Sequence, residues 1–280
     1  EHTKNSFETT LVFTVCAPLM FIIWMSFIFF LLSVVKGSVS GLKDKYICML
    51  VVLNWLFYPD IVHVLFASFA CFDIEKNGTS RLLQDFDVIC WQGKHMSMII
   101  YVCIPAMILY IIVIPLFIFR KLSSHKEIIE SMDAKNDLSR NDKYKIECFT
   151  KQYGFMFLGL KSEFFYWELV IMQRKMLIIF ATEHLVSISG AVSLLVSIII
   201  CILNIMIIIK LKPNKNDKSN DLNVLSQLVQ MVFLYFGLYY VTGFNSWYMA
   251  PDSFIHYIFI VLTFSPSLAF FFKWASLCRI

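Results

Sequence analysis

The chain has 280 residues, of which 59% are hydrophobic and only 16% are charged. Soluble domains average ~45–50% apolar and ~25% charged residues, so this composition excludes an ordinary water-soluble globule. The net charge of +4 identifies no partner, because in a membrane protein the placement of basic residues matters more than their sum. We therefore predict an all-α, polytopic membrane helical bundle that contacts the lipid bilayer and binds no nucleic acid.

Seven apolar runs are long enough, or nearly so, to cross a bilayer, which takes ~20 residues. The third contains Pro105 and Pro115, which a helix in lipid tolerates because its neighbours satisfy the freed carbonyls. In chain order the runs are 11–35, 46–72, 96–119, 164–182, 185–209, 222–243 and 254–277. The sequence thus predicts about seven transmembrane helices, with residues 11–280 as one membrane domain.

Basic residues predict how the spans are oriented, since short cytosolic loops are enriched in Lys and Arg. One set of connecting segments holds 18 of them and the other set holds four. The basic set is 36–45, 120–163, 210–221 and 273–280, and the other is 1–10, 73–95, 183–184 and 244–253. This asymmetry predicts an extracellular amino end over residues 1–10 and a cytosolic carboxyl end. The expected location is the plasma membrane or a secretory-pathway membrane, with multiple passes.

The loop after the second run carries two features typical of an extracellular segment. Asn77 begins an Asn-Gly-Thr glycosylation sequence. Cys71 and Cys90 bracket the same loop, and disulfides belong to the oxidising side of the membrane. A bridge across this loop would stabilise it by roughly 3 kcal/mol on the chain-entropy model. The alternative is two free cysteines at helix ends.

The segment 120–163 is predicted to be a cytosolic connector, with nine basic and seven acidic residues. Ser124 and Glu127 have the spacing of a capping box, which predicts a short helix through Met132. A second short helix is expected over 143–149. The segment serves either as a solvated connector or as a docking platform for membrane or cytosolic protein partners.

Motifs of soluble enzymes are missing from the sequence. It contains no glycine-rich phosphate loop, no His-Glu-x-x-His and no Gly-x-Ser-x-Gly. The six histidines are scattered without ligand spacing. Cys90 and His95 are close in sequence, but two ligands do not make a zinc site. We therefore expect no catalytic residue, no cofactor and no metal.

Polar residues recur at helical spacing in the fifth and sixth runs. Small residues four apart let a neighbouring helix approach closely, and hydroxyls and amides can bond across such a contact. We predict a helix-packing face, with a hydrophilic vestibule as the alternative. The residues concerned are Ser189, Ser193 and Ser197 in the fifth run, and Asn223, Gln227 and Gln230 in the sixth.

Charges inside the second and fourth runs predict that these two helices are neighbours. At 1.5 Å per residue, Asp60 lies ~21 Å from the cytosolic start of its run, and Arg174 and Lys175 lie ~15–16 Å from theirs. A lone charge at such depth costs at least ~2.5–3.5 kcal/mol. We therefore expect Asp60 to meet one of the two basic groups, with Glu168 near the cytosolic interface. Alternatively, the basic side chains snorkel to that interface.

Three stretches in order resemble a known protein family over roughly residues 50–245. The first includes Arg81-Leu-Leu-Gln-Asp-Phe-Asp-Val-Ile-Cys-Trp91 and His95, within residues 71–119. The second runs from Tyr153-Gly-Phe to Tyr166-Trp-Glu168 and Arg174-Lys175, and the third from Leu211-Lys-Pro to Phe236-Gly-Leu238. Their order and spacing resemble the C-terminal multispanning region of protist cysteine-rich, EGF-like surface proteins, the apicomplexan cysteine repeat modular proteins and their ciliate relatives.

The resemblance implies a large cysteine-rich ectodomain upstream of residues 1–10, and a role in host-cell attachment and in triggering secretory organelle discharge. The expected function is therefore a non-enzymatic membrane anchor and signal-transmitting region of a cell-surface receptor. Two alternatives remain open: a polycystin-like cation channel or transporter subunit, and a passive assembly scaffold.

Overall fold

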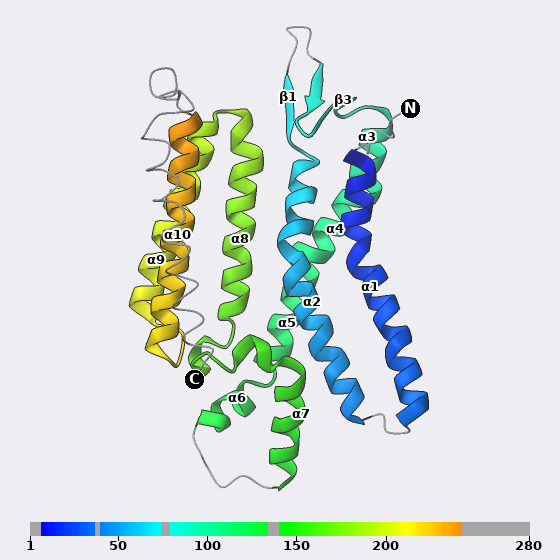
Figure 1. The fold of residues 1–280 in the computed structure, drawn as a ribbon, viewed down its shortest axis with the longest axis vertical. Coiled ribbons are helices and arrows are strands. Elements are labelled where there is room, and N and C mark those ends of the chain that lie inside the picture. Colours follow the sequence, from blue (N-terminus) through cyan, green and yellow to red (C-terminus); the bar gives the residue numbers. More distant parts are fainter. Residues whose placement is uncertain (1–6, 37–39, 74–78, 134–139, 242–280) are drawn as a thin grey trace, which may run out of the picture. The chain divides into compact units, whose positions relative to one another are not determined.

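The structure, a computed structural model, is mostly helical and describes residues 7–36, 40–73, 79–133 and 140–241 (Figure 1). Five helices in the described ranges are long and apolar enough to cross a membrane. They span Phe7–Leu31, Lys43–Ala67, Gly93–Ser123, Gly190–Leu211 and Asp217–Leu238. The chain is therefore a multi-span membrane protein with five candidate spans, and the prediction of seven is wrong for the described residues.

Two of the seven expected spans account for this difference. The fourth run forms helix α8, Trp167–His184, but its 18 residues include four charges, Glu168, Arg174, Lys175 and Glu183, so it is too polar to rank with the other five. The seventh expected run, 254–277, lies outside the described residues. A hydropathy scan merges α8 into an apolar run because isoleucines and methionines surround its charges.

The helices before the first loop are α1, Phe7–Lys36, and α2, Ser40–Ala67. After the loop, α3 to α5 form one continuous helix, Gly93–Ser123. The elements that follow are α6, Lys126–Asp133; α7, Arg140–Phe157; α8; α9, Gly190–Leu211; and α10, Asp217–Val241, with short 3-10 turns at Ser162–Phe164 and Leu185–Ser187. Helix α1 begins at Phe7, inside the stretch 1–10 that the sequence assigned to the extracellular end.

The long helix Gly93–Ser123 changes its winding before each of its prolines. It is π-helical over Ile99–Cys103, just before Pro105, and over Ile108–Val113, just before Pro115. A proline lacks an N–H and its ring collides with the carbonyl four residues earlier. The wider π turn moves that carbonyl away, so the helix continues through both prolines.

A small antiparallel sheet stands between α2 and α3, so the chain is not all-α. Its strands are β1, Cys71–Asp73; β2, Ser80–Leu82; and β3, Asp85–Ile89, in the order β1-β2-β3. Cys71 pairs with Leu82, and a bulge shifts the β2–β3 register between Arg81 and Leu82. Strands of three to five residues give too little alternation to be read from the sequence.

The connector 120–163 contains two helices, as the sequence indicated, although the second is longer than expected. Helix α6 begins at Lys126 and α7 runs on to Phe157. Ser124 does not cap α6, because its hydroxyl donates to the carbonyl of Arg120 in the preceding turn, at 2.8 Å. Ser124 is therefore the C-cap residue of α5 and not the N-cap residue of α6.

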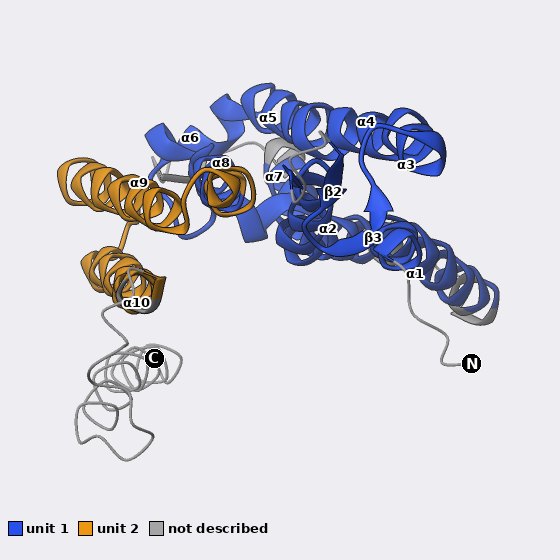
Figure 2. Cartoon of the chain, turned by 90° about the horizontal axis from the view of Figure 1, so that it is seen from above, with its two compact units in different colours: residues 1–179 blue, residues 180–280 orange. Residues whose placement is uncertain are grey.

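The described chain divides into two compact units, residues 1–179 and 180–280 (Figure 2). In the first unit, α2 lies at the centre of two hydrophobic clusters. Its Ile61 and Leu65 face a cluster formed with α1 and the helix 93–123, and its Tyr58 and Val62 face another formed with α5 to α8. These four positions, at i, i+3, i+4 and i+7, form one continuous stripe on α2, with Ile61 and Leu65 toward one edge of it and Tyr58 and Val62 toward the other.

The second unit contains an antiparallel hairpin of α9 and α10. A Cβ on Gly190 would lie 2.8 Å from Val241, and one on Gly237 would lie 3.4 Å from Leu194, so the two helices approach closely at these glycines. The connecting turn is fixed by Asn220, whose side-chain oxygen accepts from the Asn214 backbone N–H at 3.0 Å. Helix ends joined by so short a turn must lie side by side.

Polar residues of the predicted packing face occupy several places in this unit. Ser193, Ser197 and Gln227 are buried, whereas Ser189 precedes α9 as its N-cap residue. Ser193 donates to the Ala181 carbonyl of α8 at 2.9 Å, and Ser197 donates to the Ser193 carbonyl at 2.9 Å. Asn223 and Gln230 are half-buried on α10.

We predict that Ser197→Leu lowers the free energy of unfolding by ~1–3 kcal/mol, because an enlarged side chain at a fully buried position forces its neighbours to move. Ile199→Leu is the matched control, since Ile199 lies on the same helix and is 54% exposed. Reversible unfolding in mixed micelles measures both variants. Equal stability of the two would show that the serine face of α9 is not tightly packed.

Candidate functional site

The loop between α2 and α3 is closed by the disulfide that the sequence predicted. Cys71 and Cys90 are bonded, with their Cα atoms 6.3 Å apart. Cys90 comes directly after β3, and its backbone N–H donates to the carbonyl of Ser80 on β2 at 2.9 Å. The Leu83 N–H donates to the carbonyl of Ala70 at 2.8 Å. The bridge and the sheet therefore hold the same two segments together.

His95 ties this loop to the end of α2. Its ring is 2% exposed, and its Nδ1 accepts from the backbone N–H of Trp91 at 3.1 Å. An acceptor at Nδ1 requires the proton to be on Nε2, which lies 3.1 Å from the Ser68 carbonyl and donates to it. Ser68 directly follows α2, so one neutral imidazole joins the disulfide segment to this helix end.

The loop also reaches the start of α1. An Asp85 side-chain oxygen lies 3.4 Å from the Phe7 backbone N–H, and its other oxygen accepts from the Asp87 N–H at 3.1 Å. A carboxylate is favourable at a helix amino end, where backbone N–H groups lack partners. The loop 71–92 thus contacts three helices, α1, α2 and α3, at one end of the first unit (Figure 1).

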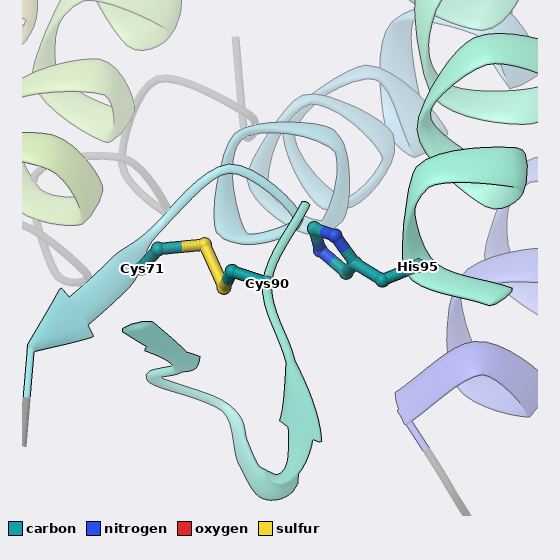
Figure 3. A group of neighbouring side chains, drawn as sticks. All are labelled: Cys71, Cys90 and His95. Atoms are coloured by element: carbon teal, nitrogen blue, oxygen red, sulfur yellow. A yellow bond between two sulfur atoms is a disulfide. The ribbon is translucent and has the colours of Figure 1, made fainter. Parts of the chain in front are cut away.

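The disulfide and His95 gather three groups of metal-ligating type. Figure 3 shows the imidazole beside the bridge, and one ligand atom from each of Cys71, Cys90 and His95 lies within 4.8 Å of the others. The sequence indicated only Cys90 and His95. The sequence does not indicate Cys71 as a third residue of this group, because Cys71 lies 24 residues before His95 and comes close to it only through the sheet.

A second polar group lies where α8 meets α2 in the first unit. The Lys175 ammonium is 4.1 Å from the centre of the Trp55 ring, a cation–π contact. Glu168 lies close enough to interact with both Lys175 and the Trp55 indole, although that buried indole N–H makes no hydrogen bond of good geometry. The Tyr58 hydroxyl, one turn along α2, is buried without a hydrogen-bond partner in the described ranges.

Asp60 takes a different position on α2. It is five residues after Trp55, which turns it ~140° around the helix, and its side chain is exposed. The charges in the sequence correctly predicted that α8 and α2 are neighbours. The partner of Lys175 on α2 is, however, the face of the Trp55 ring. The pairing of Asp60 with Arg174 or Lys175 stays a prediction. A sequence scan for opposite charges overlooks Trp55, since it counts only carboxylates as partners for a cation.

The opposite end of the first unit carries a cluster of aromatic side chains on α7. Phe149, Tyr153 and Phe157 are buried at four-residue intervals, and His125 stacks on Phe149 with ring centres 4.4 Å apart. Burial raises the pKa of the Tyr153 phenol, so that side chain stays neutral at physiological pH. The amide of Gln152 donates to a carboxylate oxygen of Asp44 on α2, at 2.7 Å. The connector is therefore packed against α2 and is not merely solvated.

Asn77 lies outside the described residues, so its glycosylation stays a prediction. The chain matches no protein-family model, no curated protein and no solved structure. Its function is therefore argued from its own residues.

We predict a coupling free energy of ~0.5–2 kcal/mol between Trp55 and Lys175, the range from exposed to desolvated cation–π contacts. A double-mutant cycle of Trp55→Leu and Lys175→Met, followed by reversible unfolding in micelles, measures it. The matched control cycle combines Asp60→Asn with Lys175→Met and is expected to show a smaller coupling. A larger coupling in the control cycle would make Asp60 the main partner of Lys175.

Proposed function

We propose that this chain is the membrane anchor and signal-transmitting region of a cell-surface receptor, with an extracellular ectodomain ahead of it and protein partners on the cytosolic side. The observation that carries the proposal is the position of α2. This helix contacts the disulfide loop at one end and α7 near the other.

The disulfide loop has two features of an extracellular segment. A bridge is stable in an oxidising compartment, and the segments on the loop's side of the chain hold four of the basic residues against 18 on the other. Both features favour an extracellular location for 71–92. A force or ligand that displaces this loop acts on α2 through the Ser68 carbonyl and on α1 through Asp85.

Helix α2 has 28 residues and is therefore ~42 Å long at 1.5 Å per residue. It contacts α7 through Asp44 near its start and through the aromatic cluster near Tyr58. A tilt or shift of α2 would alter α6 and α7, which are the docking platform for cytosolic partners in this proposal. Resemblance to the protist family extends the role to host-cell attachment and the triggering of secretory organelle discharge.

A cation channel or transporter subunit is the second candidate. The polar group of Trp55, Tyr58, Glu168 and Lys175 favours it, because ionisable side chains among membrane helices often mark a path for ions or substrates. The aromatic contact of Lys175 favours a packing role for the same residues.

For topology, we expect a cysteine at position 77 to react with an impermeant maleimide in intact cells and a cysteine at position 215 to react only after permeabilisation. The basic-residue asymmetry is the reason for this expectation. Asn77→Cys and Lys215→Cys are made in separate chains, and each is the control for the other. Labelling of position 215 alone in intact cells would reverse the orientation and remove the receptor proposal.

For the choice between receptor and channel, we expect the purified chain in liposomes to give no cation flux above that of empty liposomes. Lys175→Met is the informative variant, because it removes the charge from the polar group. Flux in the unmodified chain that Lys175→Met changes in rate or selectivity would favour the channel and contradict the receptor proposal.

A further inference from the structure

Three residues of metal-ligating type lie together at the disulfide loop, and the bridge by itself does not require an imidazole beside it. Cys90 and His95 are 3% and 2% exposed, and Cys71 lies at the start of β1 beside them (Figure 3). At Zn–S ~2.3 Å and Zn–N ~2.0 Å, tetrahedral ligands are ~3.5–3.8 Å apart. The three ligand atoms lie within 4.8 Å of one another, and the two sulfurs must separate to this spacing once their bond is broken.

The hydrogen bonds of His95 give its ring the form that a zinc ligand needs. Histidines that bind metals usually donate their other N–H to a backbone carbonyl or a carboxylate, which fixes the ring and its tautomer. Here Nε2–H donates to the Ser68 carbonyl, so the free electron pair is on Nδ1. Nδ1 accepts from the N–H of Trp91, the residue next to Cys90, so the electron pair is directed toward the cysteine segment.

Zinc binding requires the backbone N–H of Trp91 to release that electron pair. Trp91 has a φ of +65°, a conformation in which non-glycine residues are uncommon and held by their surroundings. A rotation of this residue that releases Nδ1 would leave the bond from the Cys90 N–H to the Ser80 carbonyl in place, because that bond is made by the neighbouring residue. The sheet thus retains both cysteines near His95 when the sulfurs are no longer bonded.

While the bridge is intact, its sulfurs are not thiolates and do not bind zinc. We propose that reduction of the Cys71–Cys90 bridge converts this loop into a Zn²⁺ site whose ligands are the two Sγ atoms and Nδ1 of His95, with water at the fourth position. Disulfide and metal exclude each other, so the loop has two closed forms selected by a thiol reductant and by zinc. This proposal does not depend on the receptor function.

The chemistry balances with a dithiol as the reductant. The dithiol gives two electrons and two hydrogen atoms and closes to its own disulfide, while the Cys71–Cys90 bond breaks to give two thiols. When Zn²⁺ binds, the thiols release two protons to solvent and the neutral imidazole releases none. Zinc affinity is therefore expected to fall as the pH is lowered.

The test uses the whole 280-residue chain in detergent micelles, reduced with a phosphine that is then removed without oxygen. Zn²⁺ binding is measured by competition with a coloured chelator, and Co²⁺ replaces Zn²⁺ to report thiolate ligation by its charge-transfer absorption. We expect the reduced chain to bind one ion that the oxidised chain does not bind. Cys71→Ser, Cys90→Ser and His95→Gln should each weaken binding by at least the ~10–100-fold that loss of a second-shell partner causes.

Two matched controls isolate the site. His95→Gln keeps a side-chain donor for the Ser68 carbonyl but has no nitrogen at the Nδ1 position. Cys148→Ser removes a free, half-buried cysteine elsewhere and should leave binding unchanged. Unchanged affinity in His95→Gln or in either loop cysteine variant would overturn the proposal, as would equal binding by the oxidised chain.

A measurement on the unmodified chain keeps the proposal falsifiable if a variant fails to fold. The reduced chain is alkylated with iodoacetamide with and without Zn²⁺, and mass spectrometry reports each cysteine. We expect Zn²⁺ to protect Cys71 and Cys90 together. Alkylation of both at the same rate in either condition would contradict the assignment.

Discussion

The packing of α2 against two adjoining hydrophobic clusters is the constraint on which the first unit depends. Lipid solvates apolar side chains as well as protein does, so helices in a membrane associate through close packing and polar contacts and not through a hydrophobic driving force. Tyr58 and Val62 meet α5 to α8, whereas Ile61 and Leu65 meet α1 and the helix 93–123. Helices α1 and α7 and the helix 93–123 are therefore positioned against α2.

The outer loop completes this arrangement because it fixes the end of α2. A helix end leaves backbone carbonyls without partners, and each is costly in an apolar setting. The His95 imidazole satisfies the Ser68 carbonyl just beyond α2, and the sheet satisfies the Ala70 carbonyl through Leu83. The same residues keep two cysteines and an imidazole together, so the structural role of the loop and its capacity for metal chemistry come from one set of contacts.

The charges of α8 show how a membrane protein accommodates ionisable groups away from water. Lys175 lies over an aromatic face, and Glu168 interacts with it from about two turns away on the same helix. An aromatic ring attracts a cation without the desolvation of a second full charge. Such a group stabilises helix packing in a receptor and would line a path in a transporter, which is why both functions share these residues.

The sequence by itself determined the membrane class, the disulfide partners and the two helices of the connector, because hydropathy, cysteine placement and charge are local properties of the chain. Tertiary structure alone decided that Cys71 joins His95, that Lys175 meets Trp55, and that a sheet lies between α2 and α3. The first two contacts join residues 24 and 120 positions apart, and the contact of Lys175 with Trp55 depends on the angular position of each side chain around its helix. The apolar side chains of α2 are distributed all around the helix, so its sequence carries no amphipathic pattern from which that angle could be read.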